Sequence, residues 1–398
     1  MNHVGVDPAP VSRDPLRPAN LVPGLPEMLL LTPGPVTTNP AVRAAAARDL
    51  APWDNDFRAM LSRVRDRVLA IAGGRPGEHA ALPLQGCGHF ALEAAVRTFV
   101  PPGGRMLLPS TGQYADRLRR LATEAGRTVV FMPVPDGSAA NPAEVQAALE
   151  ADPSISHAAL VYSETSTGVV HDVPALAAAA GRAGRRVIVD AVSAFGALPF
   201  DIGALPMVDS MAFTSGKCIE GLPGAAFTVA RVDRLLACAG QAASWSFDLS
   251  DIYEHGLRNG AGSHRFTPVA QALAAFDAAL DLFDAEGGQP ARLARYTANM
   301  RTLHDGVRAL GLQPCLPLDV QGPIVLNVDA PHDPAWDLQA FVDALKARGV
   351  LISNFYNTAT PSFRVGCIGA VTPDDMRGAV AAIGAALSDL GIQTRRAA

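Results

Sequence analysis

The sequence predicts an α/β protein in which a large doubly wound domain is followed by a smaller α+β domain. From about residue 41, apolar runs of four to six residues alternate with helical patterns, which is typical of parallel strands buried on both faces. Of the 398 residues, 49% are hydrophobic and 18% are charged, so the chain can form a large core and global disorder is excluded. Polar or glycine-containing loops follow several of the runs. Ligands bind at such strand ends in open α/β sheets.

The elements expected for the large domain follow one another in a regular order. A helix is expected over 57–71, where apolar residues recur at helical spacing. Strands are expected at 80–84, 105–109, 129–133, 158–162 and 187–190. One further helix is expected to begin at residue 90, and another to run over 115–125. The loops that follow strands are 85–89, 110–114, 163–168, 190–193 and 214–217. Because the carboxyl ends of parallel strands meet at one edge of a sheet, we expect these five loops to converge.

The order of elements changes after two long helical patterns, 268–286 and 289–310, which are separated by Gly287-Gly288. A strand at 324–328, a helix at 337–348, strands at 350–352 and 362–365, and a helix at 373–389 are expected next. Six prolines within 1–26 are incompatible with a helix there. We therefore expect a proline-rich, extended or disordered arm over 1–27, a large domain over 28–286 with a loop at 32–38 that enters the site, and a small domain over 287–398.

Composition argues against several classes of function. The net charge of −5 provides no basic surface for nucleic acid. No apolar run approaches the roughly 18 residues of a membrane span, and the first residues lack the apolar segment of a signal peptide. The five cysteines are odd in number and scattered, which favours reduced thiols in the cytoplasm. The nine histidines are dispersed without ligand spacing, so no metal site is expected.

One lysine stands out among the loop residues. Lys217 follows an apolar run that ends in Thr214-Ser215-Gly216, and Asp190 ends the run 186–190. Small residues before a lysine let a planar group approach the backbone closely. An acid at one strand end and a lysine just past another suit pyridoxal phosphate (PLP): the lysine forms the Schiff base and the acid keeps the pyridine nitrogen protonated. A surface lysine and a loop aspartate explain these two residues alone equally well.

The other loops carry groups that suit the same cofactor, each with a plainer alternative. Backbone amides at Cys87, Gly88 and His89 open a helix and could bind a phosphate, although a tight turn explains them too. Tyr114 could stack on a pyridine ring or belong to the core, and Val192 could pack on the other ring face. Thr165 could reach the phenolic oxygen or cap a helix.

Two further positions could meet a substrate. Arg364 lies in an apolar, strand-like run and could bind a carboxylate or phosphonate through its guanidinium fork, or form a structural salt bridge. Gly34, in Pro33-Gly-Pro35, lies either in a plain loop or in one that enters the site.

Taken together, the motifs resemble the class V, fold-type I PLP aminotransferases, and within them the 2-aminoethylphosphonate–pyruvate transaminases. The resemblance runs from about residue 28 to the C-terminus and is carried by 29–38, 53–57, 84–88, 152–157, 163–168, 189–196, 216–224, 265–268 and 363–366. It implies a mainly parallel, seven-stranded type of sheet between helices, with a smaller C-terminal domain. It also implies a homodimer with shared active sites.

The resemblance implies roles that match those argued from the residues. Lys217 and Asp190 would be catalytic, Gly88 and His89 would hold the phosphate, and Arg364 would bind the acidic end of each substrate. Thr267 would reach the phosphate of the neighbouring subunit. The expected reaction moves the amino group of 2-aminoethylphosphonate to pyruvate.

The chain departs from the family's pattern at three places: Cys87 replaces a serine, His89 replaces a threonine, and the loop 353–358 lacks a Tyr-Pro-Gly-Lys sequence. These departures leave the PLP chemistry intact and concern the choice of substrate. An alanine–glyoxylate or serine–pyruvate transaminase is the first alternative, and a PLP lyase on the same scaffold is the next. A non-catalytic PLP-binding protein is an alternative of another class, against which the Asp190–Lys217 pair argues.

Overall fold

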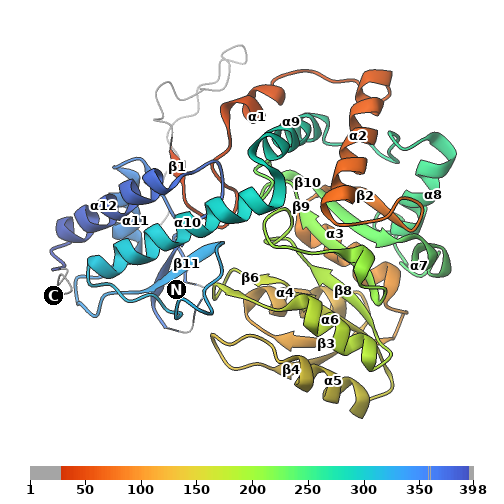
Figure 1. Cartoon of the computed structure of the whole chain (residues 1–398), viewed down its shortest axis with the longest axis horizontal. Helices are drawn as coiled ribbons and strands as arrows, with labels where there is room; N and C mark the ends of the chain where they lie inside the picture. The colour runs from red at the N-terminus through yellow and green to blue at the C-terminus, as the bar shows by residue number, and fades with distance from the viewer. Residues whose placement is uncertain (1–27, 357, 359, 394–398) are drawn as a thin grey trace, which may run out of the picture.

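A seven-stranded sheet forms the centre of the large domain in the computed structural model, which describes residues 28–356, 358 and 360–393 (Figure 1). Its order is β2-β10-β9-β8-β5-β3-β4. Neighbouring strands pair in parallel except β10, which is antiparallel to β2 and β9. The bounds are β2 (His79–Gly86), β3 (Arg105–Ser110), β4 (Thr128–Pro133), β5 (Ile155–Val161), β8 (Arg186–Asp190), β9 (Val208–Thr214) and β10 (Gly224–Arg231). The expected mainly parallel sheet is confirmed.

Helices cover both faces of this sheet, as a doubly wound fold requires. The helices of the large domain are α1 (Pro40–Ala45), α2 (Asn55–Ile71), α3 (Gly88–Phe99), α4 (Gln113–Glu124), α5 (Pro142–Ala151), α6 (Val173–Arg182), α7 (Val232–Ala237), α8 (Leu249–Asn259) and α9 (Ala270–Glu286). Along β8, Val187 and Val189 pack into the core with α2, α6 and α9, whereas Ile188 packs into the core with α3 and α4. This is why β8 reads as a continuous apolar run: both of its faces are buried.

The small domain packs its own core around two short sheets. β11 (Val325–Asp329) pairs with β13 (Ser362–Gly366), and β1 (Leu29–Leu30) pairs with β12 (Val350–Leu351). The helices around these sheets are α10 (Gly288–Ala309), α11 (Leu338–Lys346) and α12 (Pro373–Asp389). Leu31 is fully buried in this core, so the first described residues pack against the small domain and the chain then crosses to α1. Figure 1 shows α10 leading from the large domain to the small domain.

Several expected boundaries are wrong in detail. The antiparallel strand β10 was not anticipated, because its sequence, Gly224-Ala-Ala-Phe-Thr-Val-Ala-Arg231, is rich in small residues. The stretch 256–265 is rich in glycine and polar residues, which favours a loop before Thr267, but α8 continues to Asn259. Gln85, Gly86 and Ser110 end strands and do not belong to the loops that follow. The break at Gly287 is confirmed: this glycine is left-handed, with φ of 111°, and ends α9.

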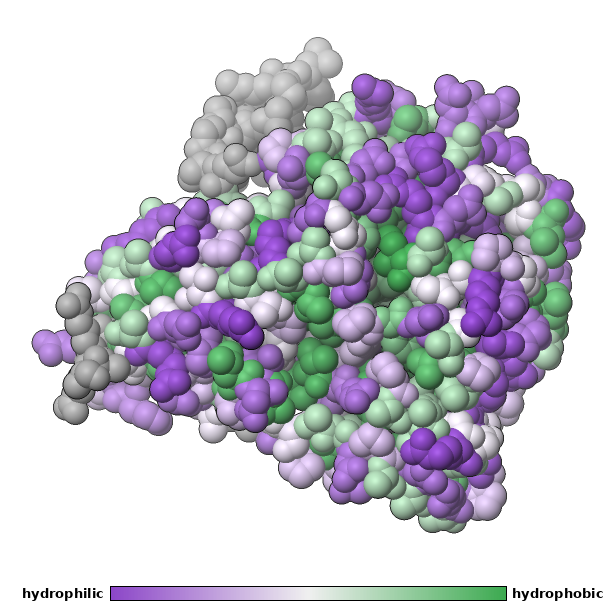
Figure 2. Space-filling model, viewed as in Figure 1, coloured by the Kyte–Doolittle hydropathy of each residue, from purple (hydrophilic) through white to green (hydrophobic). Residues whose placement is uncertain are grey.

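Polar and apolar side chains are mixed on the face shown in Figure 2, and apolar ones are most frequent near the middle, where the two domains of Figure 1 adjoin. Within the described residues, no helix is both long and apolar enough to cross a membrane.

Candidate active site

Five strand ends meet at one edge of the sheet, as the parallel pairing requires. β8 ends at Asp190, β9 is followed after a short turn by Lys217, and β3 leads to Tyr114. β2 runs in the same direction, because it lies one strand beyond the reversed β10, and it leads to Gly88. Thr165 follows the short strand β6 (Ser163–Glu164), which comes directly after β5. The topology therefore brings the predicted loops to the same edge.

The Lys217 amine is held by the loop that follows β1. Its Nζ donates a hydrogen bond of 2.6 Å to the carbonyl of Pro33. Gly34 has φ of 143°, and a Cβ at this position would lie 2.6 Å from Lys217 Cε. The backbone conformation therefore favours glycine at position 34, and a side chain there would displace the lysine. Burial lowers the pKa of Lys217, and the positive charge of Arg364 lowers it further. Tyr114 is the largest charge effect that raises this pKa.

Asp190 is a buried carboxylate that forms no ion pair with any described residue. It is 5% exposed and accepts a hydrogen bond of 2.9 Å from the backbone amide of Val192. Burial raises its pKa to about 7; Glu164 also raises this pKa, whereas the Val192 amide and Lys217 lower it. A buried carboxyl with only one hydrogen bond and no ion pair can accept a cationic group from a ligand.

The amino end of α3 is open for an anion. Its N-cap residue, Cys87, is exposed and makes no side-chain capping hydrogen bond, so the first amides of the helix are available. Gly88 must be glycine, because a Cβ there would overlap Val192 Cγ2. The start of α3 at Gly88 therefore lies directly against Val192, in the loop that follows Asp190. His89 is partly buried, and burial, followed by the charge of Arg117, lowers its pKa.

Glu164 is a buried acid that the sequence reading missed. It is 0% exposed, and its carboxylate accepts hydrogen bonds from the amides of Tyr114 and Ala115, each at 3.3 Å, and from Ser166. It therefore caps α4 from another segment and fixes the backbone of Tyr114. Burial raises the pKa of Glu164, although these hydrogen bonds oppose the shift. An acid within a run of small hydroxyl residues, Ser163-Glu-Thr-Ser166, was the available signal.

Tyr114 and Thr165 lie beside each other. Burial raises the pKa of Tyr114, but Lys217, the Thr165 hydroxyl, Arg364 and Arg117 together lower it. The Thr165 hydroxyl itself is buried and forms no hydrogen bond of ordinary geometry with a described residue. It is therefore available to a ligand that enters between these side chains.

Arg364 reaches this edge from the small domain. It is 5% exposed on β13, its Nη1 lies 3.3 Å from the Thr165 carbonyl oxygen, and its Nε lies 3.3 Å from Ser353 Oγ. The exposed ring of Phe355 covers the guanidinium at 4.8 Å. Burial lowers the pKa of Arg364, and Tyr114 is the largest influence that opposes this shift. The loop 353–358 thus contributes side chains beside the guanidinium.

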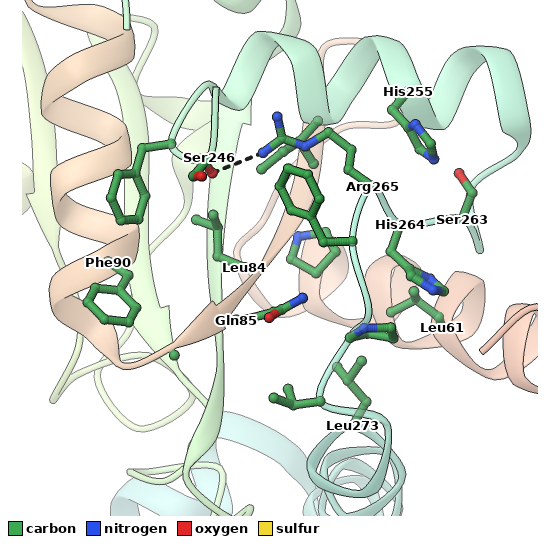
Figure 3. A pocket seen from close by; sticks show the side chains of 17 residues that line it. Leu61, Leu84, Gln85, Phe90, Ser246, His255, Ser263, His264, Arg265 and Leu273 are labelled. Atoms are coloured by element: carbon green, nitrogen blue, oxygen red, sulfur yellow. Dashed lines mark hydrogen bonds between the residues drawn. The ribbon is translucent and has the colours of Figure 1, made fainter. Parts of the chain in front are cut away.

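Thr267 is the predicted site residue that lies apart from the others. It is exposed, and its carbonyl accepts a hydrogen bond from Gln85, two residues before Cys87. Next to it is a largely apolar cavity of about 350 Å³, lined by Leu84, Phe90, Phe247 and others (Figure 3). Figure 3 shows Arg265 lying across this cavity toward Ser246, whose carbonyl it binds at 3.0 Å. This cavity is separate from the Lys217 loop.

A cluster of charged side chains binds the turn after Lys217 to helix α10. Glu220 has φ of 63° and accepts hydrogen bonds from Arg295 at 2.7 Å and from Tyr296 at 2.6 Å. Arg295 also donates to the carbonyls of Gly369 and Val371 in the small domain. The lysine turn and the small domain are therefore fixed to the same helix.

Comparison with known sequences identifies this architecture. The sequence profile of the family described as aminotransferase class-V matches residues 41–362. The chain belongs to the class-V aminotransferase family. Among curated relatives of this aminotransferase, the 2-aminoethylphosphonate–pyruvate transaminase of Burkholderia ambifaria is 43% identical over 372 residues, which cover 94% of this chain and 99% of the relative. A protein of Cupriavidus pinatubonensis named 2-aminoethylphosphonate–pyruvate transaminase 1 is 40% identical and covers 92% and 95% of the two chains.

Solved structures support the same fold for this class-V aminotransferase. The pyridoxamine–pyruvate aminotransferase of Mesorhizobium loti superposes with a TM-score of 0.82, at 25% identity, over 92% of this chain and 93% of that one. The alanine–glyoxylate aminotransferase of a Nostoc species superposes with a TM-score of 0.84 over 95% and 100% of the chains, at 23% identity. The resemblance noted from the sequence motifs is thus confirmed.

Proposed function

We propose that this aminotransferase uses pyridoxal phosphate to move the amino group of 2-aminoethylphosphonate to pyruvate, giving phosphonoacetaldehyde and alanine. The observation that carries the proposal is the convergence of three groups at one sheet edge: the Lys217 amine, the buried Asp190 carboxylate and the buried Arg364 guanidinium. The curated relatives, which match over nearly their whole length, support this choice of substrates.

The residues present fit the cofactor. The open amino end of α3 at Cys87, Gly88 and His89 suits a phosphate. Asp190 suits a protonated pyridine nitrogen, because burial leaves this carboxylate short of a positive partner. The available Thr165 hydroxyl suits the phenolic oxygen, and Tyr114 and Val192 would lie on the two ring faces. When bound, pyridoxal phosphate supplies an aldehyde that accepts the amino group and a ring that withdraws electrons.

The chain's own side chains then divide the remaining work. Lys217 Nζ would act as general base and acid in each half-reaction. It would take the proton from the amino-bearing carbon of the donor and deliver it to the cofactor carbon that bears the aldehyde, and it would carry a proton in the reverse direction when the acceptor is aminated. Its lowered pKa favours the neutral amine that this step needs. The carbonyl of Pro33 orients the amine when it is not bonded to the cofactor. Arg364 would bind the acidic group of each substrate, and the loop at Gly34, which contacts Lys217, would line the same site.

The phosphate site would be completed by a second copy of this chain. The Trp245 and Phe266 side chains, 70% and 39% exposed, pack edge to face at 5.0 Å beside Thr267. Exposed aromatic pairs of this kind favour an interface, and we expect Thr267 to reach the phosphate bound by the partner in a homodimer. Sedimentation that shows an active monomer at assay concentration would overturn this arrangement. We also expect the enzyme to work in the cytoplasm, since its five cysteines are free thiols.

A panel of amino donors with pyruvate as acceptor tests the proposed substrates. We expect 2-aminoethylphosphonate to give the highest kcat/KM, and to bleach the absorbance of the bound cofactor in a single half-reaction. Alanine–glyoxylate transamination is the second candidate, because Gly88-His89 departs from the phosphonate enzymes toward that group. A panel in which 2-aminoethylphosphonate gives no turnover, while alanine and glyoxylate do, would favour it.

A further inference from the structure

Arg117 lies near the candidate active site without a role in the reaction described above. It is three residues after Tyr114 on α4, so both side chains lie on one face of the helix. Its guanidinium carbon is 5.0 Å from the centroid of the Tyr114 ring. The next arginines on α4, Arg119 and Arg120, pair with Asp116 and Glu124. Arg117, in contrast, forms no ion pair with any residue that the structure describes.

The segment that anchors α4 also contacts Arg364. Glu164 binds the amide of Tyr114 at 3.3 Å, and the neighbouring Thr165 carbonyl lies 3.3 Å from Arg364 Nη1. The Arg364 guanidinium thus contacts this short turn, and the Arg117 guanidinium lies over the ring of Tyr114, whose backbone the turn holds. Burial lowers the pKa of both His89 and Arg364, and the nearby charge of Arg117 acts in the same direction on each. Two positive charges near one another repel, and an anion bound between them removes this repulsion.

We propose that Arg117 supplies a second positive charge to a phosphorus oxyanion bound at this edge of the sheet. Two such groups are expected within its field: the phosphonate of the substrate beside Arg364, and the phosphate of the cofactor beside His89. Either group can carry two negative charges, so one guanidinium leaves it incompletely neutralised. A carboxylate carries one charge and gains less from a second cation. Assignment to the substrate rests on the proposed function, whereas assignment to the cofactor does not.

Three variants of the holoenzyme test the proposal: Arg117→Gln, Arg117→Lys and the control Arg119→Gln. Arg119 is a matched control because it is also exposed on α4 and also covers an aromatic ring, that of Phe131 at 4.7 Å. The first measurement is the inhibition constant of ethylphosphonate, compared with that of propanoate. The second is the Kd of pyridoxal phosphate for the cofactor-free protein. Both are repeated at low and high salt, since an exposed charge is screened.

We expect Arg117→Gln to weaken either ethylphosphonate or pyridoxal phosphate by roughly twofold to fivefold, the size of one exposed charge-assisted contact. Propanoate should change little. Arg117→Lys should restore most of the affinity, and the loss should shrink at high salt. A change in the ethylphosphonate constant alone assigns Arg117 to the substrate, and a change in the Kd of pyridoxal phosphate alone assigns it to the cofactor.

Unchanged constants for both phosphorus compounds, or equal losses in Arg117→Gln and Arg119→Gln, would overturn the proposal. A wild-type enzyme that does not turn over 2-aminoethylphosphonate would instead count against the proposed function. Both binding measurements on Arg117 would still be decisive in that case.

Discussion

Two buried aspartates, at opposite ends of adjacent strands, show how the same sheet builds structure and function differently. Asp209, near the start of β9, is 0% exposed and is paired with Arg186, Arg234 at 3.1 Å and His157 at 3.1 Å. Asp190, at the end of β8, is 5% exposed and forms no ion pair with a described residue. Burial raises the pKa of both, but at Asp209 the hydrogen bonds and charges of these partners outweigh it and lower the pKa. At Asp190 burial prevails.

The two aspartates therefore act on folding stability with opposite signs. The ionised Asp209 contributes stability above the pKa of an unfolded aspartate, and this contribution is lost as the pH falls through its lowered folded pKa. Asp190 in the cofactor-free protein binds a proton more tightly when folded, so stability falls as the pH rises from about 4 toward 7. The chain thus neutralises Asp209 with its own side chains, whereas Asp190 has no positive partner among the described residues.

The largest expected effect is at the functional end of the sheet, on the lysine. Lys217→Ala should abolish turnover while pyridoxal phosphate still binds without a covalent bond, because no other amine is held at this position. Steady-state rates and the absorbance of the bound cofactor measure the two effects. Near-normal transamination by this variant would remove the lysine from the reaction.

The next largest effect is on Asp190 itself. Asp190→Asn should lower kcat by orders of magnitude and weaken cofactor binding, since a neutral amide cannot keep the pyridine nitrogen protonated. The measurement is kcat together with the Kd of pyridoxal phosphate. A variant with the wild-type kcat would show that another residue does this work, and the comparison with Asp209 would then lose its meaning.

Asp209→Asn should show the opposite pattern. It should lower the free energy of unfolding by roughly 3 kcal/mol, the low end for a broken buried ion pair, because the arginine partners keep some contact with water. The kcat of the folded enzyme should change little, since the residue lies at the other end of the strands. Denaturant unfolding and assays at low temperature separate the two. A loss of kcat with unchanged stability would contradict the structural role.

An effect of similar size, on transition-state binding instead of folding, is expected at the substrate's acidic group. Arg364→Lys should cost roughly 2–5 kcal/mol of transition-state binding, although the charge is kept, because an ammonium cannot make paired contacts. Both half-reactions should lose kcat/KM, measured with each substrate in single turnovers. If the variant impaired only the pyruvate step, the phosphonate would need another binding group, such as the loop at Gly34.

The sequence was most informative where local pattern and chemistry coincide. Lys217 after small residues and Asp190 at a strand end were predictable, because the apolar runs before them locate both strands. Contacts between distant segments were not predictable from local pattern. Glu164 becomes a helix cap only when β6 lies beside α4, and Arg364 reaches the Thr165 carbonyl from a strand 199 residues further along the chain. The strand β10 was missed because it contains three alanines, and alanine favours helices over strands.

Titration of the Asp190 carboxyl tests the central difference most directly. Infrared difference spectra of wild type and Asp190→Asn, each free of cofactor and followed against pH, isolate the carbonyl stretch of this one protonated acid. We expect a protonated carboxyl that titrates near pH 7 without the cofactor and is ionised across the neutral range once pyridoxal phosphate is bound. An Asp190 carboxyl that is already ionised below pH 5 in the cofactor-free protein, and unaffected by the cofactor, would contradict the idea that this acid is left for a cationic ligand.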